Sequence, residues 1–223
     1  MNIINKYSPK TINDFDYDDH YKKMIQNFIN KDFLNVIIIG EHGTGKTALL
    51  NCIVKEYFYN INTEENPIKE NNTNVFRINN LKDCGISFYR NEVKNFCQFP
   101  SKVKKLIIID DLDMVDKSIQ AIFKYYIEKW NRNFYFIATT TNPHKINESL
   151  LAKTYQLELP KKNINVIHNI LNKICQKEKF CITSKAKDYI AENCNGSVKL
   201  LFMFMQKIYF LNQKPPICTS GNS

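Results

Sequence analysis

A short apolar run that leads into a glycine-rich turn constrains this chain more than any other feature. Residues 34–39 read Leu-Asn-Val-Ile-Ile-Ile, and the next eight residues, Gly40 to Thr47, fit the pattern G-x-x-x-x-G-K-T. The apolar run predicts a strand that is buried on both faces, and Ala48–Phe58 has helical spacing. Because glycines let successive backbone N–H groups turn toward phosphate oxygens, a phosphate-binding loop is expected between this strand and this helix.

The residue types in the loop indicate a nucleotide site. Lys46 is expected to reach the β- and γ-phosphates of ATP, and Thr47 to ligate Mg²⁺. The alternative is a chance glycine-rich turn, but the chain has only 6 glycines, and three of them fall on this pattern. We therefore expect ATP and Mg²⁺ to bind at Gly40, Glu41, His42, Gly43, Thr44, Gly45, Lys46 and Thr47.

A second apolar run, Leu106–Ile109, ends in carboxylates at Asp110, Asp111 and Asp113. This arrangement predicts Asp110 as a Mg²⁺ ligand, through water, and Asp111 as the general base that orients an attacking water. Asp111 and Lys46 are therefore the candidate catalytic residues. Many such enzymes carry Glu at the position of Asp111, and the shorter Asp side chain would hold the base farther from the water. For Asp113 the alternative is a carboxylate that caps a helix.

A third polar segment follows the strand expected at Phe134–Ala138. It reads Thr-Thr-Thr-Asn-Pro, and Thr140, Thr141 and Asn142 are candidates for contact with the γ-phosphate. The same residues are ordinary turn formers, so the prediction depends on their position beside the other two motifs.

Strands and helices alternate up to about residue 160, and only helices follow. Further strands are expected at Val75–Ile78 and Tyr155–Leu159, further helices at Phe88–Phe96 and Ile119–Trp130, and an exposed insertion at 61–74. After Pro160 the helical segments are Val166–Cys175, Ser184–Asn193 and Val198–Phe210. The pattern predicts an α/β ATPase core at 1–160, with a parallel sheet covered by helices on both faces, an all-helical lid at 161–212 and an unstructured tail at 213–223.

Composition indicates where in the cell the protein is expected and what kind of partner it binds. No apolar run reaches 18 residues and the N-terminus lacks the apolar stretch of a signal peptide, so an intracellular protein without a membrane span is expected. The seven cysteines contain no C-x-x-C pair, which favours reduced thiols. The net charge of +9 is uneven, with +2 on residues 1–160 and +7 on residues 161–223. It indicates a polyanionic partner, although an AT-rich, Lys-rich composition is an alternative cause.

In order along the chain, these motifs resemble those of clamp-loader AAA+ ATPases, and most closely the small subunits of replication factor C. Besides the three segments above, the resemblance rests on four blocks: Lys6–Phe15, Arg77–Phe96, Lys145–Leu151 and Gly196–Leu200.

The resemblance implies an AAA+ domain with a helical lid, in an ATP-binding subunit of a DNA sliding-clamp loader. Such a subunit couples ATP binding and hydrolysis to clamp loading on primer–template DNA during replication. Its partners would be other clamp-loader subunits, the clamp and DNA phosphates, in the nucleus or at a cytoplasmic viral replication site. By position, the resemblance assigns nucleotide contacts to Tyr7, Pro9 and Lys199, and DNA contacts to Lys82, Arg90 and Lys94.

Several positions depart from the family pattern. The finger motif Ser-Arg-Cys is replaced by Ala152-Lys153-Thr154, and Lys199 stands where the second sensor carries Arg. Lys lacks the planar fork of Arg. These changes leave two alternatives open: a catalytically weakened nucleotide-binding scaffold subunit, and another AAA+ loader such as a helicase loader. Arg90 and Lys94 could equally form a solvated helix face. In the family a C-terminal collar domain follows the lid. The 223 residues are expected to be either a naturally short protein or part of a longer chain, which leaves assembly into a pentamer open.

Overall fold

The computed structural model describes residues 3–31, 33–60, 73–78, 85–180 and 182–212. The chain divides into two compact units, one of Pro9–Pro160 and one of Met1–Ser8 with Lys161–Ser223. The division after Pro160 lies where the sequence pattern changes from alternating strands and helices to helices alone. The expected tail, 213–223, and most of the expected insertion at 61–74 lie outside the described residues.

The larger unit is built on a five-stranded, fully parallel sheet with the strand order β2-β3-β4-β1-β5. The expected parallel α/β fold is thereby confirmed, and each expected strand is present within two residues of its predicted ends. The strands are β1 (Val36–Ile39), β2 (Val75–Ile78), β3 (Lys105–Ile109), β4 (Phe134–Thr140) and β5 (Tyr155–Glu158).

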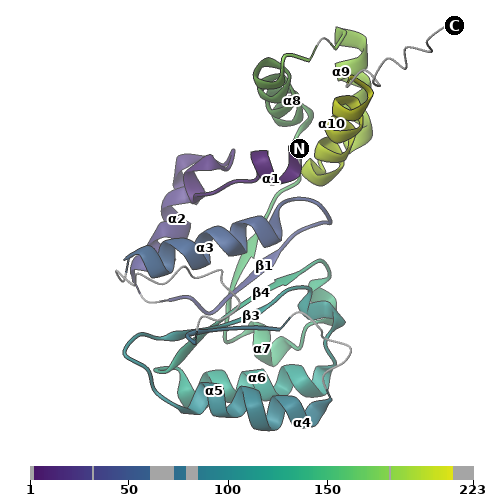
Figure 1. Cartoon of the computed structure of the whole chain (residues 1–223). Helices are drawn as coiled ribbons and strands as arrows, with labels where there is room; N and C mark the ends of the chain where they lie inside the picture. The colour runs from purple at the N-terminus through teal and green to yellow at the C-terminus, as the bar shows by residue number, and fades with distance from the viewer. Residues whose placement is uncertain (1–2, 32, 61–72, 79–84, 181, 213–223) are drawn as a thin grey trace, which may run out of the picture. The chain divides into compact units, whose positions relative to one another are not determined.

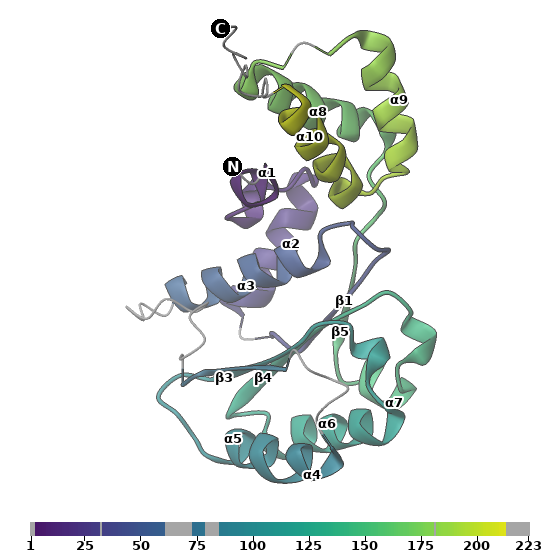
Figure 2. The ribbon, with the colours of Figure 1, turned by 45° about the vertical axis from the view of Figure 1, so that its right-hand side comes forward.

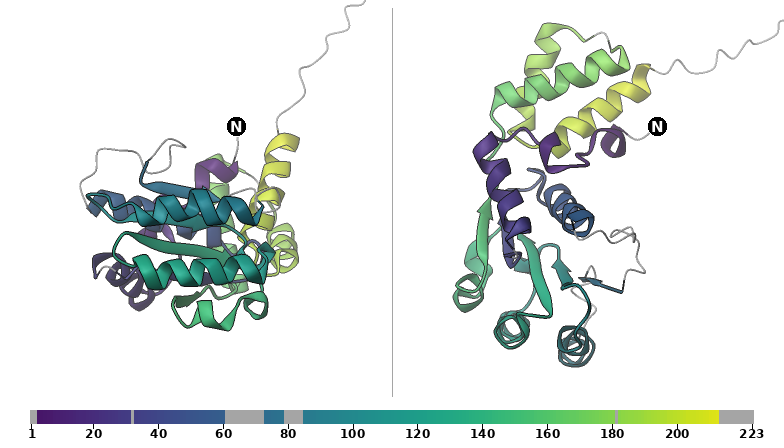
Figure 3. Two further views of the ribbon diagram at one scale, coloured as in Figure 1. Left: turned by 90° about the horizontal axis from the view of Figure 1, so that it is seen from below. Right: turned by 90° about the vertical axis from the view of Figure 1, so that its left-hand side faces the viewer.

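Helices cover both faces of this sheet (Figure 1; Figure 3, right). Alternate side chains of the strands serve the two faces: Val36 and Ile38 pack in one apolar core, and Ile37 and Ile107 in the other. The first face carries α2 (Asp19–Asn30) and α3 (Lys46–Asn60). The second carries α4 (Ile86–Phe88), the π-helical turn η2 (Tyr89–Val93), α5 (Lys94–Gln98), α6 (Lys117–Trp130) and α7 (Glu148–Leu151).

The sequence analysis missed α2, which lies beside α3 in Figure 2. Its signals are readable in retrospect. The side chain of Asp18 accepts a hydrogen bond from the Tyr21 backbone N–H at 2.7 Å, as an N-cap residue does. Ile25 and Ile29, four residues apart, are buried against the sheet.

The segment expected as one helix at Phe88–Phe96 runs from Ile86 to Gln98 and is interrupted by a π-turn. The extra residue in that turn changes which side chains face inward. Tyr89, Val93 and Cys97 are fully buried, whereas Phe96 is only partly buried and packs on Phe76. The described residues of this unit also contain the short 3₁₀ turns η1 (Ile12–Asp14), η3 (Leu112–Met114) and η4 (Pro143–Lys145).

The second unit consists of α1 (Ile3–Tyr7), α8 (Ile164–Glu178), α9 (Ser184–Cys194) and α10 (Val198–Asn212). The expectation that residues 1–8 belong to the ATPase core is wrong. Ile3 is buried among residues of the helical unit, and its backbone N–H donates to Gln206 Oε1 at 2.8 Å. The Tyr7 hydroxyl donates to Glu178 Oε1 at 2.6 Å. An apolar side chain at residue 3 therefore docks the first helix on the last one.

A positive φ is required at one glycine of the helical unit. Gly196, between α9 and α10, has φ +76°, and a Cβ there would come within 2.8 Å of the Lys162 carbonyl oxygen. A side chain would therefore disturb the start of α10. Among the described residues, no helix combines the length and the apolar character needed to cross a bilayer.

Candidate nucleotide-binding site

The glycine-rich loop connects β1 to α3 at the carboxyl edge of the sheet (Figures 1 and 2). Gly43 and Gly45 have φ values of +79° and +102°, in the region that glycine adopts most readily. The Gly40 backbone N–H donates to the Thr140 carbonyl oxygen at 3.2 Å, which attaches the start of the loop to β4. The Thr44 hydroxyl donates to the Glu41 carbonyl oxygen at 2.9 Å. The loop is therefore held in shape by backbone and hydroxyl contacts.

Lys46 begins α3 and turns back over this loop. Its Nζ donates to the carbonyl oxygens of Gly40 and Glu41, at 2.8 and 3.0 Å. Burial lowers the pKa of Lys46, while the negative charges of Asp111 and Asp110 act in the opposite direction. The buried ammonium of Lys46 therefore lies near carboxylates and donates to two neutral carbonyl oxygens. When an anionic ligand is present, the ammonium can donate to the ligand's oxygens instead.

Asp110 follows β3 directly and is held by two hydroxyls. Thr47 donates to its Oδ2 at 3.0 Å, and Thr139, on the neighbouring strand β4, donates to its Oδ1 at 2.5 Å. Thr139 is fully buried, and its hydroxyl also accepts the Asp111 backbone N–H at 3.0 Å. Thr139 was not among the residues expected at the site. Its place opposite the end of β3 follows from strand pairing, which the sequence does not reveal.

The donor set at Asp110 fits Mg²⁺. A carboxylate and a hydroxyl lie within hydrogen-bonding distance, and Mg²⁺ is bound by oxygen ligands from one or two carboxylates together with phosphates and waters. Asp110 and Thr47 are therefore the residues that would hold the ion, and their role as Mg²⁺ ligands stays a prediction.

Asp111 is in the left-handed region, with φ and ψ both 57°. A non-glycine residue in this conformation is uncommon and is retained where surrounding contacts hold it. Here the Asp111 N–H is bonded to Thr139, and its carbonyl oxygen accepts the Met114 N–H at 2.9 Å. The side chain of Asp111 is exposed, so water has access to it.

Asp113 has a role that the sequence analysis did not assign. Its carboxylate accepts hydrogen bonds from the Thr140 hydroxyl at 3.0 Å, the Thr141 hydroxyl at 2.9 Å and the Thr141 N–H at 3.3 Å. It does not cap α6, whose N-cap residue is Asp116. Burial alone would raise the pKa of Asp113, but the hydrogen bonds from Thr141 and Thr140 outweigh it and leave the pKa below its ordinary value. The ionised carboxylate thus positions both threonines.

A buried glutamine also links the loops that follow β3 and β4, at a point farther from the carboxyl edge of the sheet. Gln120 on α6 is fully buried. Its Nε2 donates to the Val115 carbonyl oxygen at 2.9 Å and to that of Lys145 at 3.3 Å, and its Oε1 accepts the Asn147 N–H at 2.7 Å. The loops that follow β3 and β4 are therefore linked by side chains at two levels.

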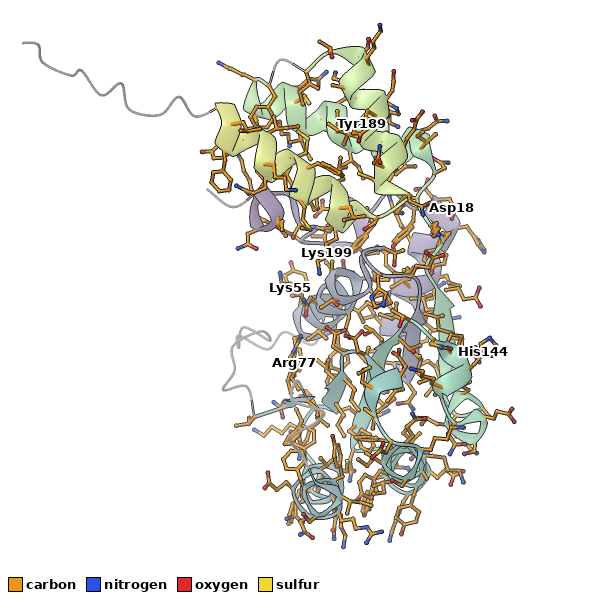
Figure 4. All side chains as sticks on the ribbon, turned by 90° about the vertical axis from the view of Figure 1, so that its right-hand side faces the viewer. Asp18, Lys55, Arg77, His144, Tyr189 and Lys199 are labelled. Atoms are coloured by element: carbon orange, nitrogen blue, oxygen red, sulfur yellow. The ribbon has the colours of Figure 1, made fainter. Side chains whose placement is uncertain are left out.

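One further cation lies near the carboxylates. Arg77 on β2, below α3 in the view of Figure 4, donates from Nη2 to Asn51 Oδ1 at 2.7 Å. Asn51 is one helical turn after Thr47 on α3. Burial lowers the pKa of Arg77, and the charge of Asp110 partly opposes this. The sequence analysis named Arg77 only as the start of the block Arg77–Phe96, on which the family resemblance rests.

The remaining expected site residues are distributed over both units. Asn142 caps η4, with its Oδ1 accepting the His144 N–H at 3.2 Å. The Pro9 carbonyl oxygen accepts the Cys52 thiol at 3.5 Å. Tyr7 and Lys199 lie in the helical unit, so their contact with a nucleotide stays a prediction; Lys199 is exposed near the start of α10 (Figure 4).

Tyr7 has its polar group engaged within its own unit. Burial, followed by the hydrogen bond to Glu178 and the charge of that carboxylate, raises the pKa of Tyr7 to about 12. Lys6 forms an ion pair with the same carboxylate at 2.5 Å.

The structure describes two of the three residues that were expected to bind DNA. Arg90 and Lys94 are exposed on the segment formed by η2 and α5. Lys82 lies outside the described residues. Lys153, at the position of the family's finger, is exposed and forms an ion pair with Glu128 at 3.1 Å.

Residues 36–160 match the family model described as "ATPase family associated with various cellular activities (AAA)". The chain belongs to the AAA family. Membership implies nucleotide binding, and it confirms the AAA+ fold expected from the sequence.

Among curated proteins, this AAA chain is similar to proteins that are named as replication factor C subunits. It is 28% identical over 214 residues to a protein of Acanthamoeba polyphaga mimivirus described as a replication factor C small subunit, covering 95% of this chain and 64% of the relative. It is 24% identical to replication factor C subunit 3 of Saccharomyces cerevisiae, covering 91% and 58%. The resemblance to replication factor C small subunits is thereby confirmed. The chain spans less than two thirds of the length of either relative.

Among solved structures, the AAA chain resembles the RuvB Holliday junction branch migration motor of Thermotoga maritima. The TM-score is 0.70 with 16% sequence identity, over 92% of this chain and 65% of that one. At this identity the likeness concerns the fold alone.

Proposed function

We propose that this AAA protein is an ATP-binding subunit of a DNA sliding-clamp loader, which couples ATP binding and hydrolysis to clamp loading on primer–template DNA. The arrangement at the carboxyl edge of the sheet carries the proposal. There Lys46, Thr47 and Asp110 are brought together, and the loops after β3 and β4 are joined by Thr139 and Asp113. The similarity to replication factor C small subunits along 95% and 91% of the chain supports the same function.

Each residue would have a distinct task. The loop N–H groups and Lys46 would bind the phosphates, and Thr47 with Asp110 would hold Mg²⁺, which supplies charge neutralisation between phosphates. Asp111, exposed beside Asp110, would orient the attacking water and accept its proton. Thr140 and Thr141, which Asp113 holds, and Asn142, whose N–H donates to the Thr140 hydroxyl, would contact the outermost phosphate. The place of action would be a site of DNA replication, in the nucleus or at a cytoplasmic viral replication site.

The DNA contact would be made through phosphates. Arg90 and Lys94 lie on exposed helix surface, and such side chains bind the backbone without reading its sequence. Duplex affinity of the double variant Arg90→Ala/Lys94→Ala should then fall, and its log–log salt slope should drop by about 1.8, since each phosphate contact contributes about 0.9.

The nucleotide site is tested with a fluorescent ATP analogue. We expect Lys46→Ala to abolish binding, because the ammonium that faces the phosphates is lost. Lys55, labelled in Figure 4, is on the same helix about two and a half turns after Lys46. Lys55→Ala removes an equal charge and should bind normally. Equal affinity of the two variants would refute the site assignment.

The partners are tested by affinity purification from the native source. Recovery of a sliding clamp with other clamp-loader subunits is the expected result. Recovery of a replicative helicase without a clamp would instead favour a helicase loader.

A second candidate function is a nucleotide-binding scaffold subunit with weak hydrolysis. The ion pair between Lys153 and Glu128 favours it, because a lysine paired within its own chain is a poor substitute for an arginine that reaches a neighbour's nucleotide. A DNA-stimulated ATPase rate that Asp111→Asn removes, with ATP binding retained, would exclude this candidate.

A further inference from the structure

The amino edge of the sheet carries a hollow that the nucleotide site does not use. Asn35 directly precedes β1, Lys104 precedes β3, and Tyr155 begins β5. These residues line a hollow of about 400 Å³ together with Phe33, Asn131, Arg132, Tyr135 and Lys153. The phosphate-binding loop is at the opposite edge, separated by the length of the strands at about 3.3 Å per residue.

A second hollow adjoins the first along α2. Its volume is about 430 Å³, and Phe33 lines both hollows. The other residues that line it are His20, Lys23, Met24, Asn27, Phe28 and Lys31. Both hollows lie in the Pro9–Pro160 unit, so they belong to one compact body.

The two hollows form one strip, and the charged residues that the structure describes in its lining are basic. Its lining includes Lys23 and Lys31 in one hollow and Lys104, Arg132 and Lys153 in the other, and no Asp or Glu is among the described residues that line either hollow. Asp32, between Lys31 and Phe33 in the sequence, lies outside the described residues. Residues 1–160 carry a net charge of only +2, so the strip is a local concentration of cations rather than a reflection of Lys-rich composition. Glu128 offsets part of the charge of Lys153, leaving the other four cations as the stronger contributors.

Aromatic rings lie between the cations. Phe33 and Tyr155 are 53% and 47% exposed, although burial of such large rings would stabilise the fold. Their ring centroids are 6.1 Å apart, and Tyr155 also contacts Phe28 at 5.1 Å, so the three rings form one cluster where the hollows meet.

Hydrogen bonds connect the residues on the floor of the first hollow. Lys104 Nζ lies 4.4 Å from the centroid of the Tyr135 ring and 3.0 Å from its hydroxyl. Asn35 accepts the Phe136 N–H through Oδ1, and its carbonyl oxygen accepts the Tyr155 N–H at 2.7 Å. These contacts hold Lys104 and Asn35 in place at the floor of the hollow.

We propose that this strip, from Lys23 past Phe33 to Arg132, binds single-stranded nucleic acid. Cations that follow a groove contact successive phosphates, and exposed rings stack on unpaired bases; this combination is typical of proteins that bind single strands without sequence preference. Two adjoining hollows that share one ring fit more than one nucleotide. The site is distinct from the nucleotide-binding loop and from Arg90 and Lys94, so it does not depend on the proposed function.

The charge contribution is tested by fluorescence anisotropy of a labelled oligo(dT) of 12 nucleotides at several salt concentrations. Lys23→Ala/Arg132→Ala removes two exposed cations of the strip, and the log–log salt slope should fall by about 1.4, since each single-strand phosphate contact contributes about 0.7. Lys117→Ala/Lys185→Ala removes two exposed cations elsewhere and should leave the slope unchanged. Equal losses in the two double variants would overturn the proposal.

The stacking contribution is tested in the same assay. Phe33→Ala should weaken binding about tenfold at unchanged salt slope, and Phe33→Trp should retain binding. Because Phe33 is half exposed, folding should be preserved, which urea unfolding checks. An unchanged affinity of Phe33→Ala would overturn the proposal.

Two competition experiments identify the ligand class. Unlabelled oligo(dT) should displace the probe, whereas a 12-base-pair duplex and dTMP should displace it at least tenfold less effectively. Equal displacement by the duplex would indicate a general polyanion surface, and equal displacement by dTMP a mononucleotide pocket. An acidic peptide that competes as well as oligo(dT) would indicate a protein partner. Each of these results would overturn the proposal.

Discussion

Replacing Asp113 by Asn removes one negative charge from the link between the loops after β3 and β4. The carboxylate accepts three hydrogen bonds, from the hydroxyls of Thr140 and Thr141 and from the Thr141 N–H. The amide of Asn keeps one oxygen acceptor and puts an N–H₂ donor in place of the other. Asp113→Asn therefore keeps the shape of the side chain while it loses the charge and part of the hydrogen bonding.

The expected loss of stability is about 1–3 kcal/mol. A hydrogen bond to a charged acceptor contributes about 1.5–3 kcal/mol and a neutral one about 1 kcal/mol, and the partial exposure of Asp113 keeps the sum of the three below the simple total. With a urea dependence of about 2 kcal/mol per M, the unfolding midpoint should fall by roughly 0.5–1.5 M.

The dependence on pH gives a sharper test. The pKa of Asp113 is lowered in the folded protein, relative to about 3.9 in the unfolded chain. A lowered pKa contributes stability that is fully present above the unfolded pKa and is lost as pH falls through the folded pKa. The difference between the wild-type protein and Asp113→Asn should therefore be constant from pH 8 to about 5 and should shrink at pH 4 and below.

The assay is urea unfolding followed by tryptophan fluorescence. Trp130, on α6, is the only tryptophan of the chain, so the signal reports on the unit that contains Asp113. Asp116→Asn is the matched control: Asp116 is exposed in the same loop and its side chain makes no capping hydrogen bond, so its loss should cost less than about 0.5 kcal/mol. An equal loss in the control, or a difference for Asp113→Asn that persists undiminished at pH 3.5, would refute the reasoning.

Three further predictions use the same structure. Gln120→Leu should lower the free energy of unfolding by about 2–4 kcal/mol, because the Asn147 N–H and the Val115 carbonyl oxygen lose their buried partner. The same fluorescence assay measures this loss, and a change below about 0.5 kcal/mol would contradict the bridging role. Arg77→Gln should increase the affinity for Mg²⁺ in the presence of nucleotide about threefold, because a cation near Asp110 is removed. The affinity for nucleotide without Mg²⁺ should stay the same. A Mg²⁺ titration that gives equal affinities for the variant and the wild-type protein would refute this prediction. Gly196→Ala should destabilise the helical unit by at least about 1 kcal/mol, as the Cβ would approach the Lys162 carbonyl oxygen at a positive φ; a thermal unfolding curve by circular dichroism that is unchanged would count against it.

Much of the fold could be predicted because its signals are local. A buried parallel strand is a short apolar run, and an amphipathic helix repeats every 3.6 residues, so the strands and most helices were found within two or three residues of their ends. The helix α2 was missed because its apolar positions are interspersed with charged ones, and the π-turn at Tyr89–Val93 has no sequence signature.

The candidate site was predicted only where one segment holds the chemistry. The spacing of Gly40–Thr47 determines a phosphate loop, and the strand ending at Asp110 determines a carboxylate beside it. The roles of Thr139 and Asp113 depend on which strand lies next to β3, and strand order is a property of long-range pairing.

The sequence by itself therefore determined the succession of strands and most helices along the chain, the phosphate-binding loop and the AAA resemblance, since each depends on neighbours within one segment. Only the tertiary structure decided that Thr139 bonds both Asp110 and Asp111, that residues 1–8 join the helical unit, and that Phe33 lies beside Tyr155. Contacts between residues about 30 to 200 positions apart are set by packing and strand register. The spacing of residues along the chain does not specify them.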